Sequence, residues 1–108
     1  MHSLAEITAL YEKNFDKNNF DLQPKSLYQA VNHILAIKGK RIRPLLLLMA
    51  CDLFEGNLSI ALNSAFALEV FHNFSLVHDD IMDAADIRRG QPTVHKLYGV
   101  NNAILAGD

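Results

Sequence analysis

The stretch NLSIALNSAFALEVFHNFSLVHDDIMD, residues 57–83, decides the fold class of this chain. It is apolar at most positions and contains no proline or glycine, so it predicts one long helix over about Ser59–Met82, capped by Asn57 or Ser59. Three aspartates arrive together at its end, where the carbonyl groups of a helix already carry partial negative charge. Carboxylates are disfavoured there unless a cation is present, so this helix end is a candidate site.

Three segments in front of this stretch also have the period of a helix. Apolar residues over Leu4–Phe15 predict a first helix, which ends in the polar run Asp16–Asn19. A second helix is predicted over Pro24–Gly39, because proline suits the first turn and glycine the end. A third is predicted over Pro44–Phe54, and Gly56 closes it.

Shorter elements follow the long helix. Residues 84–92 read as a polar loop, after which Thr93 is placed to cap a short helix that ends at Tyr98. Residues 101–106 form a last helical run. Because no segment alternates apolar and polar residues in the way of a strand, the fold class is predicted to be all-α.

The composition is that of one small globular domain. The chain has 108 residues, of which 50% are hydrophobic and 20% charged, and its formal net charge of -2 gives no reason to expect nucleic acid or an anionic membrane as a partner. A single cysteine, Cys51, favours a reducing compartment, so we expect a cytoplasmic protein. The longest apolar run, Leu45–Cys51, is far below the ~20 residues of a membrane span, so no stable membrane insertion is expected.

The three aspartates Asp79, Asp80 and Asp83 project over one arc of the long helix, because successive residues are separated by about 100°. Carboxylates this close repel one another, which requires raised pKa values or a bound cation. Oxygen ligands favour Mg²⁺, which shares phosphate oxygens with a substrate, whereas the plain alternative is a solvated acidic helix end. His72 lies on the same arc two turns earlier, as an anion ligand or a core histidine, and His78 is expected to be structural.

Two basic segments suit a phosphate group. Residues 39–44, GKRIRP, place Lys40 and Arg43 in front of a helix N-terminus, where a point charge, a bidentate fork and backbone N–H groups can meet a diphosphate. The doublet Arg88-Arg89 has the same potential. Each segment taken alone is equally compatible with an ordinary solvated connection or surface loop.

In combination these segments resemble a known family. GKRIRP, FHNFSLVHDDIMD, RRGQPTVH and NNAILAGD, in that order and spacing, resemble the trans-prenyltransferases, the isoprenyl diphosphate synthases that join isopentenyl diphosphate to an allylic diphosphate. The resemblance covers residues 39–108 and implies the N-terminal part of the isoprenoid synthase helical bundle. DDIMD looks like the first aspartate-rich motif of that family, whose carboxylates hold Mg²⁺ against the allylic diphosphate.

The resemblance also implies roles for single residues. It implies that Asp79, Asp80 and Asp83 are the metal ligands and, with Arg88, the catalytic residues. Arg88 matches a position that binds the allylic diphosphate. The positions that match ligands of isopentenyl diphosphate are Lys40, Arg43, His72 and Arg89.

Product length in the family depends on side chains about one turn before the first aspartate. The resemblance implies Phe74, with Phe71 as a second candidate, and an expected product of fifteen or twenty carbons, twenty being favoured. Helix geometry alone favours Ser75, which falls about 40° from Asp79, whereas Phe74 falls about 140° away. Plain core packing is the alternative role of Phe74.

Full-length members of the family are several times longer and carry a second aspartate-rich motif on a later helix. We therefore expect residues 1–108 to be the N-terminal portion of a single polyprenyl synthase domain, inactive alone, whose parent is a homodimer. One alternative is a helical partner or self-associating module with vestigial motifs. Another is a class I terpene synthase, against which GKRIRP counts because a cyclase has no isopentenyl diphosphate to hold.

Overall fold

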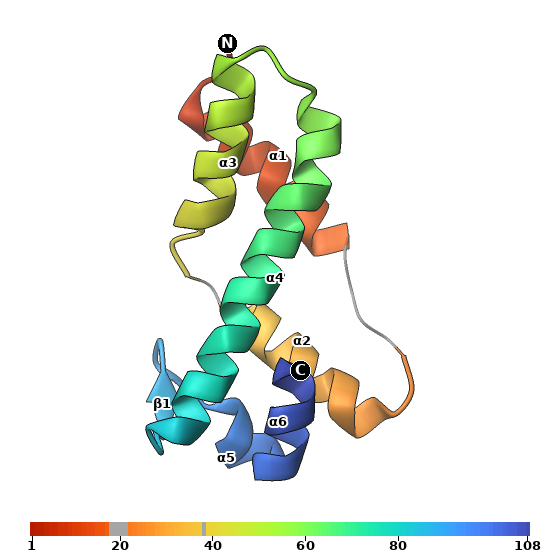
Figure 1. The fold of residues 1–108 in the computed structure, drawn as a ribbon, viewed down its shortest axis with the longest axis vertical. Coiled ribbons are helices and arrows are strands. Elements are labelled where there is room, and N and C mark those ends of the chain that lie inside the picture. The colour runs from red at the N-terminus through yellow and green to blue at the C-terminus, as the bar shows by residue number, and fades with distance from the viewer. Residues whose placement is uncertain (18–21, 38) are drawn as a thin grey trace. The chain divides into compact units, whose positions relative to one another are not determined.

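The computed structural model describes residues 1–17, 22–37 and 39–108. Over these residues the regular secondary structure is helical except for two strands of two residues each, which confirms the all-α prediction (Figure 1). Backbone contacts divide the chain into two compact units. Unit 1 comprises Met1–Asn18 and Lys40–Val70, and unit 2 comprises Asn19–Gly39 and Phe71–Asp108.

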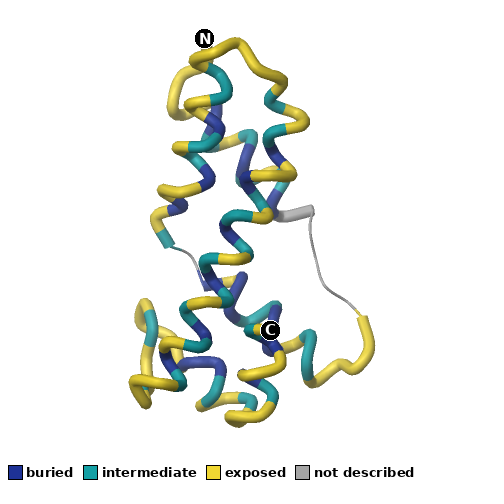
Figure 2. Tube along the Cα trace, in the orientation of Figure 1, coloured by how far each residue is buried: buried dark blue, intermediate teal, exposed yellow. Residues whose placement is uncertain are grey.

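Unit 1 contains α1 (Leu4–Lys17), α3 (Ile42–Leu53) and the first half of α4 (Leu58–Met82). Helices α1 and α3 pack against each other. Phe15 of α1 lies edge-on to Phe66 of α4, with 5.7 Å between the ring centroids. Buried positions alternate with exposed ones along these helices (Figure 2). The buried apolar side chains of this core are Ile7, Tyr11, Phe15, Leu48, Leu62 and Ala65.

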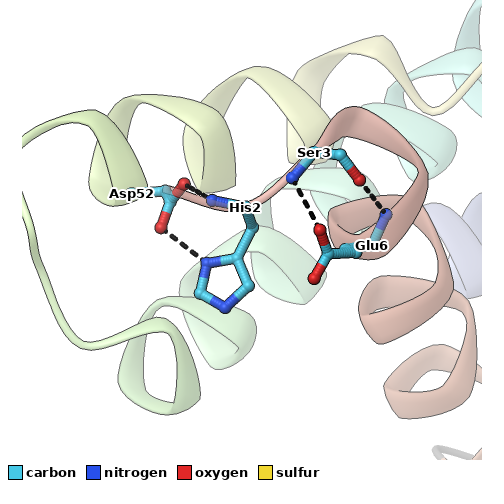
Figure 3. Close-up of polar contacts among 4 residues, drawn as sticks. All are labelled: His2, Ser3, Glu6 and Asp52. Carbon is cyan, nitrogen blue, oxygen red and sulfur yellow. Dashed lines mark hydrogen bonds and ion pairs between the residues drawn. The ribbon is translucent and has the colours of Figure 1, made fainter.

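Local polar contacts define the ends of these helices. Ser3 Oγ accepts a 3.2 Å hydrogen bond from the Glu6 N–H, and Glu6 Oε1 accepts a 3.1 Å bond from the Ser3 N–H, which is a reciprocal capping box (Figure 3). His2 lies beside Asp52 of α3, with 2.8 Å between His2 Nδ1 and Asp52 Oδ1 (Figure 3). Hydrogen bonds from His2 hold the pKa of Asp52 below its ordinary value.

The long helix begins where its cap predicts. Asn57 Oδ1 accepts hydrogen bonds from the N–H groups of Ser59 (2.9 Å) and Ile60 (3.3 Å), so Asn57 is the cap and the alternative, Ser59, is wrong. By contrast, α3 begins at Ile42 rather than at Pro44. Pro44 is buried within the first turn, where its missing N–H costs no helical hydrogen bond.

Unit 2 contains α2 (Lys25–Ala36), the second half of α4, β1 (Ile87–Arg88), β2 (Gln91–Pro92), α5 (Val94–Tyr98) and α6 (Val100–Gly107). Helix α6 packs against α2 and α5, and α5 also packs against α2. The core of this unit is aliphatic. Its buried side chains include Val31, Ile34, Leu35, Val77, Val94, Ala103 and Ala106.

The boundaries of three other helices also differ from the predicted ones. Helix α2 ends at Ala36 instead of continuing to Gly39, and residue 38 lies outside the described part. Helix α1 continues through Lys17, which belongs to the predicted polar run. The last two residues of that run lie outside the described part of the chain. Helix α6 is one residue longer at each end than residues 101–106.

The predicted polar loop contains a small hairpin. Strands β1 and β2 pair antiparallel, with Ile87 opposite Pro92 and Arg88 opposite Gln91. Thr93 stands at the predicted cap position of α5, but its hydroxyl donates to the Ala85 carbonyl (2.9 Å) instead of capping the helix. The role of Thr93 is therefore to close the base of the hairpin.

Among the described residues, α4 is the one helix long and apolar enough to cross a membrane, judged by length and composition. A single helix of this kind is weak support for a membrane span, because the core helix of a soluble protein meets the same criteria. The last turn of α4 contains Asp79 and Asp80, and Asp83 directly follows the helix.

Candidate active site

The site begins where α4 ends. The Ala84 N–H donates to the Ile81 carbonyl and the Ala85 N–H to the Asp80 carbonyl, and Ala84 has a φ of 52°. This is a Schellman ending with a left-handed residue just beyond the helix. The reversal carries the chain from the aspartates of α4 directly into β1.

The three aspartates are not equivalent. Asp79 and Asp83 are exposed, whereas Asp80 is only 4% exposed. Arg88 of β1 donates two hydrogen bonds to Asp80, from Nε to Oδ2 at 2.8 Å and from Nη2 to Oδ1 at 2.7 Å. The cation that this helix end requires thus comes from the following strand, in a bidentate pair.

The pairing changes the electrostatics of Arg88. Its hydrogen bonds to Asp80 raise the pKa of the guanidinium against the opposing effect of partial burial. The negative charges of Asp80, Asp79 and Asp83 act in the same direction. Arg88 is therefore a cation that Asp80 holds in place and that also interacts electrostatically with Asp79 and Asp83.

The residues can be compared with the needs of Mg²⁺. In the described part of the chain, no three His, Cys, Asp or Glu residues are grouped closely enough to hold a metal ion. Both oxygens of Asp80 accept from Arg88. Asp79 and Asp83, exposed on successive turns, fit a cation that takes one or two carboxylates and completes its shell with water and phosphate oxygens.

Arg89 occupies the tip of the hairpin. It and Gly90 have φ values of 51° and 78°, the backbone of a tight two-residue turn, and arginine is an unusual residue for the left-handed region. Its Nη1 donates a long 3.5 Å hydrogen bond to the Ile37 carbonyl.

Gly39 makes room for this guanidinium. A Cβ atom added at Gly39 would lie 2.5 Å from Arg89 Cζ, so any larger residue displaces the arginine. Arg89 also lines a cavity of about 350 Å³ together with His33, Ala36, Ile37 and Gln91. Gly39 of GKRIRP thus leaves space for the Arg89 guanidinium, and the local sequence does not show this relation.

The basic residues of GKRIRP separate into two kinds. Lys40 and Arg43 are exposed in unit 1. Arg41 between them is 7% exposed, with its guanidinium 4.0 Å from the Phe15 ring centroid and Nη1 3.6 Å from Glu69 Oε1. Arg41 is therefore a structural residue.

The sequence contained one signal for the burial of Arg41. Glu69 is the only charged residue in the apolar stretch between Asn57 and His78, and a buried carboxylate requires a partner. Burial also raises the pKa of the neighbouring Tyr11 hydroxyl, so that group stays neutral.

The residues of α4 proposed for substrate binding and product length lie in unit 2. His72 and Phe74 are half-buried, and Ser75 is exposed, with its hydroxyl donating to the His72 carbonyl at 2.6 Å. Phe71 is 74% exposed. His78 Nε2 lies 3.1 Å from the Ile104 carbonyl, a contact to α6 that agrees with a structural role.

The structure therefore brings together Asp80 and Arg88, with Arg89 next to them on the same hairpin. It places Lys40 and Arg43 in the other unit. The family model described as polyprenyl synthetase matches residues 24–108 of this chain, which includes all of these residues. This chain belongs to the polyprenyl synthetase family.

Curated relatives of this polyprenyl synthetase chain agree with one another. It is 51% identical over 96 residues to a geranylgeranyl diphosphate synthase of Saccharolobus solfataricus, covering 89% of this chain and 28% of that protein. It is 55% identical over 82 residues to one of Sulfolobus acidocaldarius, covering 76% of this chain and 25% of that protein. The chain thus spans about a quarter of the length of these curated relatives.

Solved structures support the same family. A geranylgeranyl pyrophosphate synthase superposes with a TM-score of 0.93 at 46% identity, over 100% of this chain and 33% of that one. The corresponding enzyme of Geoglobus acetivorans gives 0.90 at 40% identity, over 97% of this chain and 34% of that one. The resemblance found in the sequence motifs is confirmed.

Proposed function

We propose that this polyprenyl synthetase chain forms the N-terminal part of an enzyme that condenses isopentenyl diphosphate with an allylic diphosphate. The observation that carries the proposal is the bidentate Arg88–Asp80 pair, set between two exposed carboxylates and the exposed cation of Arg89. Such an arrangement can hold two phosphate-bearing groups next to each other. The names of the curated relatives favour a twenty-carbon product over a fifteen-carbon one.

Breaking the allylic carbon–oxygen bond develops negative charge on the departing diphosphate. Arg88, oriented by Asp80, offers a preorganised positive charge to that group. Asp79 and Asp83 would hold Mg²⁺, which when bound supplies further neutralisation of the diphosphate oxygens. The apolar residues of α4 keep water away from the allylic carbon.

Isopentenyl diphosphate requires a second set of cations. We assign its diphosphate to Lys40, Arg43, His72 and Arg89, which the family motifs match. Arg89 beside its cavity gives this assignment support within unit 2. The isopentenyl double bond then attacks the allylic carbon, and the resulting cation loses a proton, for which we propose the departed diphosphate as the base. Holding the double bond against the allylic carbon is a task of positioning.

Assembly and location complete the proposal. The parent enzyme is proposed to be a cytoplasmic homodimer without stable membrane insertion or nucleic-acid binding, and the 108-residue chain is proposed to be inactive alone. Titration calorimetry tests the site itself. Mg²⁺ should bind weakly and bind more tightly with an unreactive allylic diphosphate analogue, while isopentenyl diphosphate should bind without metal.

One variant distinguishes the binding of isopentenyl diphosphate from that of the allylic diphosphate. Arg89→Ala should weaken binding of isopentenyl diphosphate to a low but measurable affinity and leave binding of the allylic analogue with Mg²⁺ nearly unchanged. Product formation from labelled substrates by the 108-residue chain would contradict its proposed inactivity. Failure of the wild-type chain to bind either diphosphate would contradict the proposed site.

A non-catalytic, self-associating module is the second candidate, and one surface favours it. Helix α3 exposes the apolar side chains Ile42, Leu46, Met49 and Leu53 at helical spacing, with exposed fractions of 41–59%. A stripe of this kind normally contacts another apolar surface. Sedimentation velocity distinguishes the two functions, since a module should dimerise without Mg²⁺ or diphosphate and bind neither.

A further inference from the structure

His33 of α2 connects three elements of unit 2. Its Nε2 lies 2.9 Å from the carbonyl oxygen of Pro92 in β2. Because a carbonyl can only accept, Nε2 carries the proton and donates it. The imidazole also lies edge-on to Tyr98 of α5, with 5.8 Å between the ring centroids and 61° between the planes. One side chain therefore holds α2, β2 and α5 together.

The hairpin needs support of this kind. Two strands of two residues are too short to be stable by themselves. Thr93 closes the base of the hairpin from within, through its N–H on the Asp86 carbonyl (3.0 Å) and its hydroxyl on the Ala85 carbonyl (2.9 Å). His33 provides a contact from outside, on the strand opposite β1.

The hydrogen bond that holds Pro92 also restrains Arg88 and Arg89, because the pairing of the two strands connects them to Pro92. Pro92 pairs with Ile87 and Gln91 pairs with Arg88, and Arg89 follows in the two-residue turn. His33 and Arg89 also line the same cavity of about 350 Å³, a size within the usual range for small-molecule sites. The side chain that holds the hairpin thus lies beside the cation at its tip.

We propose that His33 is a positioning residue for Arg89, acting through its hydrogen bond to the Pro92 carbonyl. This inference rests on the proposed function insofar as Arg89 binds the diphosphate of isopentenyl diphosphate. His33 itself needs no contact with the ligand. Its contribution is to keep the left-handed turn, and hence the guanidinium, at one place beside the cavity.

Three substitutions of His33 distinguish the contribution of its hydrogen-bond donor from that of its aromatic ring. His33→Phe keeps a ring against Tyr98 but removes the donor, and should weaken the binding of isopentenyl diphosphate by about three- to ten-fold. His33→Gln carries an amide nitrogen at a reach similar to that of Nε2 and should restore most of the affinity. His33→Asn is the matched control, because its amide falls short and should behave like phenylalanine.

A double-mutant cycle tests whether His33 acts through Arg89. Isothermal titration of the 108-residue chain with isopentenyl diphosphate should show that His33→Phe has no further effect once Arg89→Ala is present. Thermal unfolding of each variant confirms that the chain is folded. An equal loss from His33→Phe with and without Arg89 overturns the proposal, as does full affinity in His33→Phe.

A second measurement needs no ligand. Amide hydrogen exchange at Thr93, whose N–H bonds to Asp86 at the base of the hairpin, should accelerate by about three- to ten-fold in His33→Phe and not in His33→Gln. Unchanged exchange in His33→Phe also overturns the proposal. If the wild-type chain binds no isopentenyl diphosphate, the proposed function fails, and the exchange rates still decide whether His33 holds the hairpin.

Discussion

Replacing Arg88 by leucine tests the pair on which the candidate site depends. Asp80 is 4% exposed, and two hydrogen bonds of 2.8 and 2.7 Å from Arg88 compensate for its burial. Arg88→Leu leaves that carboxylate without its cation, a change that costs about 3–5 kcal/mol when both groups are fully buried. Because 24% of the Arg88 side chain is exposed, we expect a loss of about 3 kcal/mol.

A loss of this size is easily measured. The free energy of unfolding of a domain of this length is about 5–15 kcal/mol. A loss of about 3 kcal/mol in this free energy lowers the melting temperature by about 10–20 °C. Arg88→Lys keeps the charge but loses the fork, and should cost about 1 kcal/mol. Asp80→Asn should also cost less than Arg88→Leu, because the partly exposed guanidinium can turn to water.

Urea denaturation followed by circular dichroism gives the coupling within the pair. Asp80→Asn/Arg88→Leu should be more stable than the sum of the single losses predicts, by at least about 1.5 kcal/mol. A coupling below about 0.5 kcal/mol would refute the argument that Arg88 compensates for the burial of Asp80.

The pH dependence of this contribution has a definite sign. The folded-state pKa of Arg88 is raised above an ordinary value that already lies far above neutrality. Stability from a raised pKa is fully present below the unfolded value and is lost only as pH rises through the folded value. The Arg88 contribution should therefore be constant between pH 6 and pH 9, as denaturation at several pH values can show.

Three further predictions follow from the same region. Ala84→Gly should stabilise the chain by about 0.5–1 kcal/mol in urea denaturation, because Ala84 has a positive φ; an equal destabilisation would contradict the Schellman ending. Asp79→Asn with Asp83→Asn should abolish the Mg²⁺-dependent tightening of allylic diphosphate binding in calorimetry, whereas Asp86→Asn, an exposed control, should retain it. In a full-length enzyme, Phe74→Ala should shift chromatographed products to longer chains, and an unchanged distribution with lower stability would leave Phe74 as a packing residue.

The helices could be predicted because their information is local. The apolar period locates α1 to α4, and the side chain of Asn57 marks the first turn of α4 through hydrogen bonds to nearby N–H groups. A helix boundary was predicted less accurately where its residue is allowed at several positions of the first turn and no capping side chain marks the start. Pro44 fits any position of a first turn, so it could not fix the start of α3 at Ile42.

The hairpin could not be predicted for a physical reason. Strands of two residues have no period, and Arg-Gly lacks the Asn or Asp that usually announces a turn with two positive φ values. Its register depends on side chains from elsewhere, namely His33 of α2 and Thr93. The contact between His33 and Pro92 joins residues 59 positions apart, so a local sequence pattern cannot predict it.

The basic residues show why a charge pattern alone cannot assign a site. Arg41 and Arg43 are two residues apart, yet Arg41 is buried against Phe15 and Glu69 while Arg43 is exposed. A buried guanidinium must have its charge compensated within the protein, so it has little positive potential left for a ligand. Arg88 lies between these cases, since it is paired with Asp80 and still partly exposed, which keeps it fixed in place and within reach of a diphosphate. The degree of compensation, which only the folded chain sets, therefore distinguishes structural arginines from those that can bind phosphate.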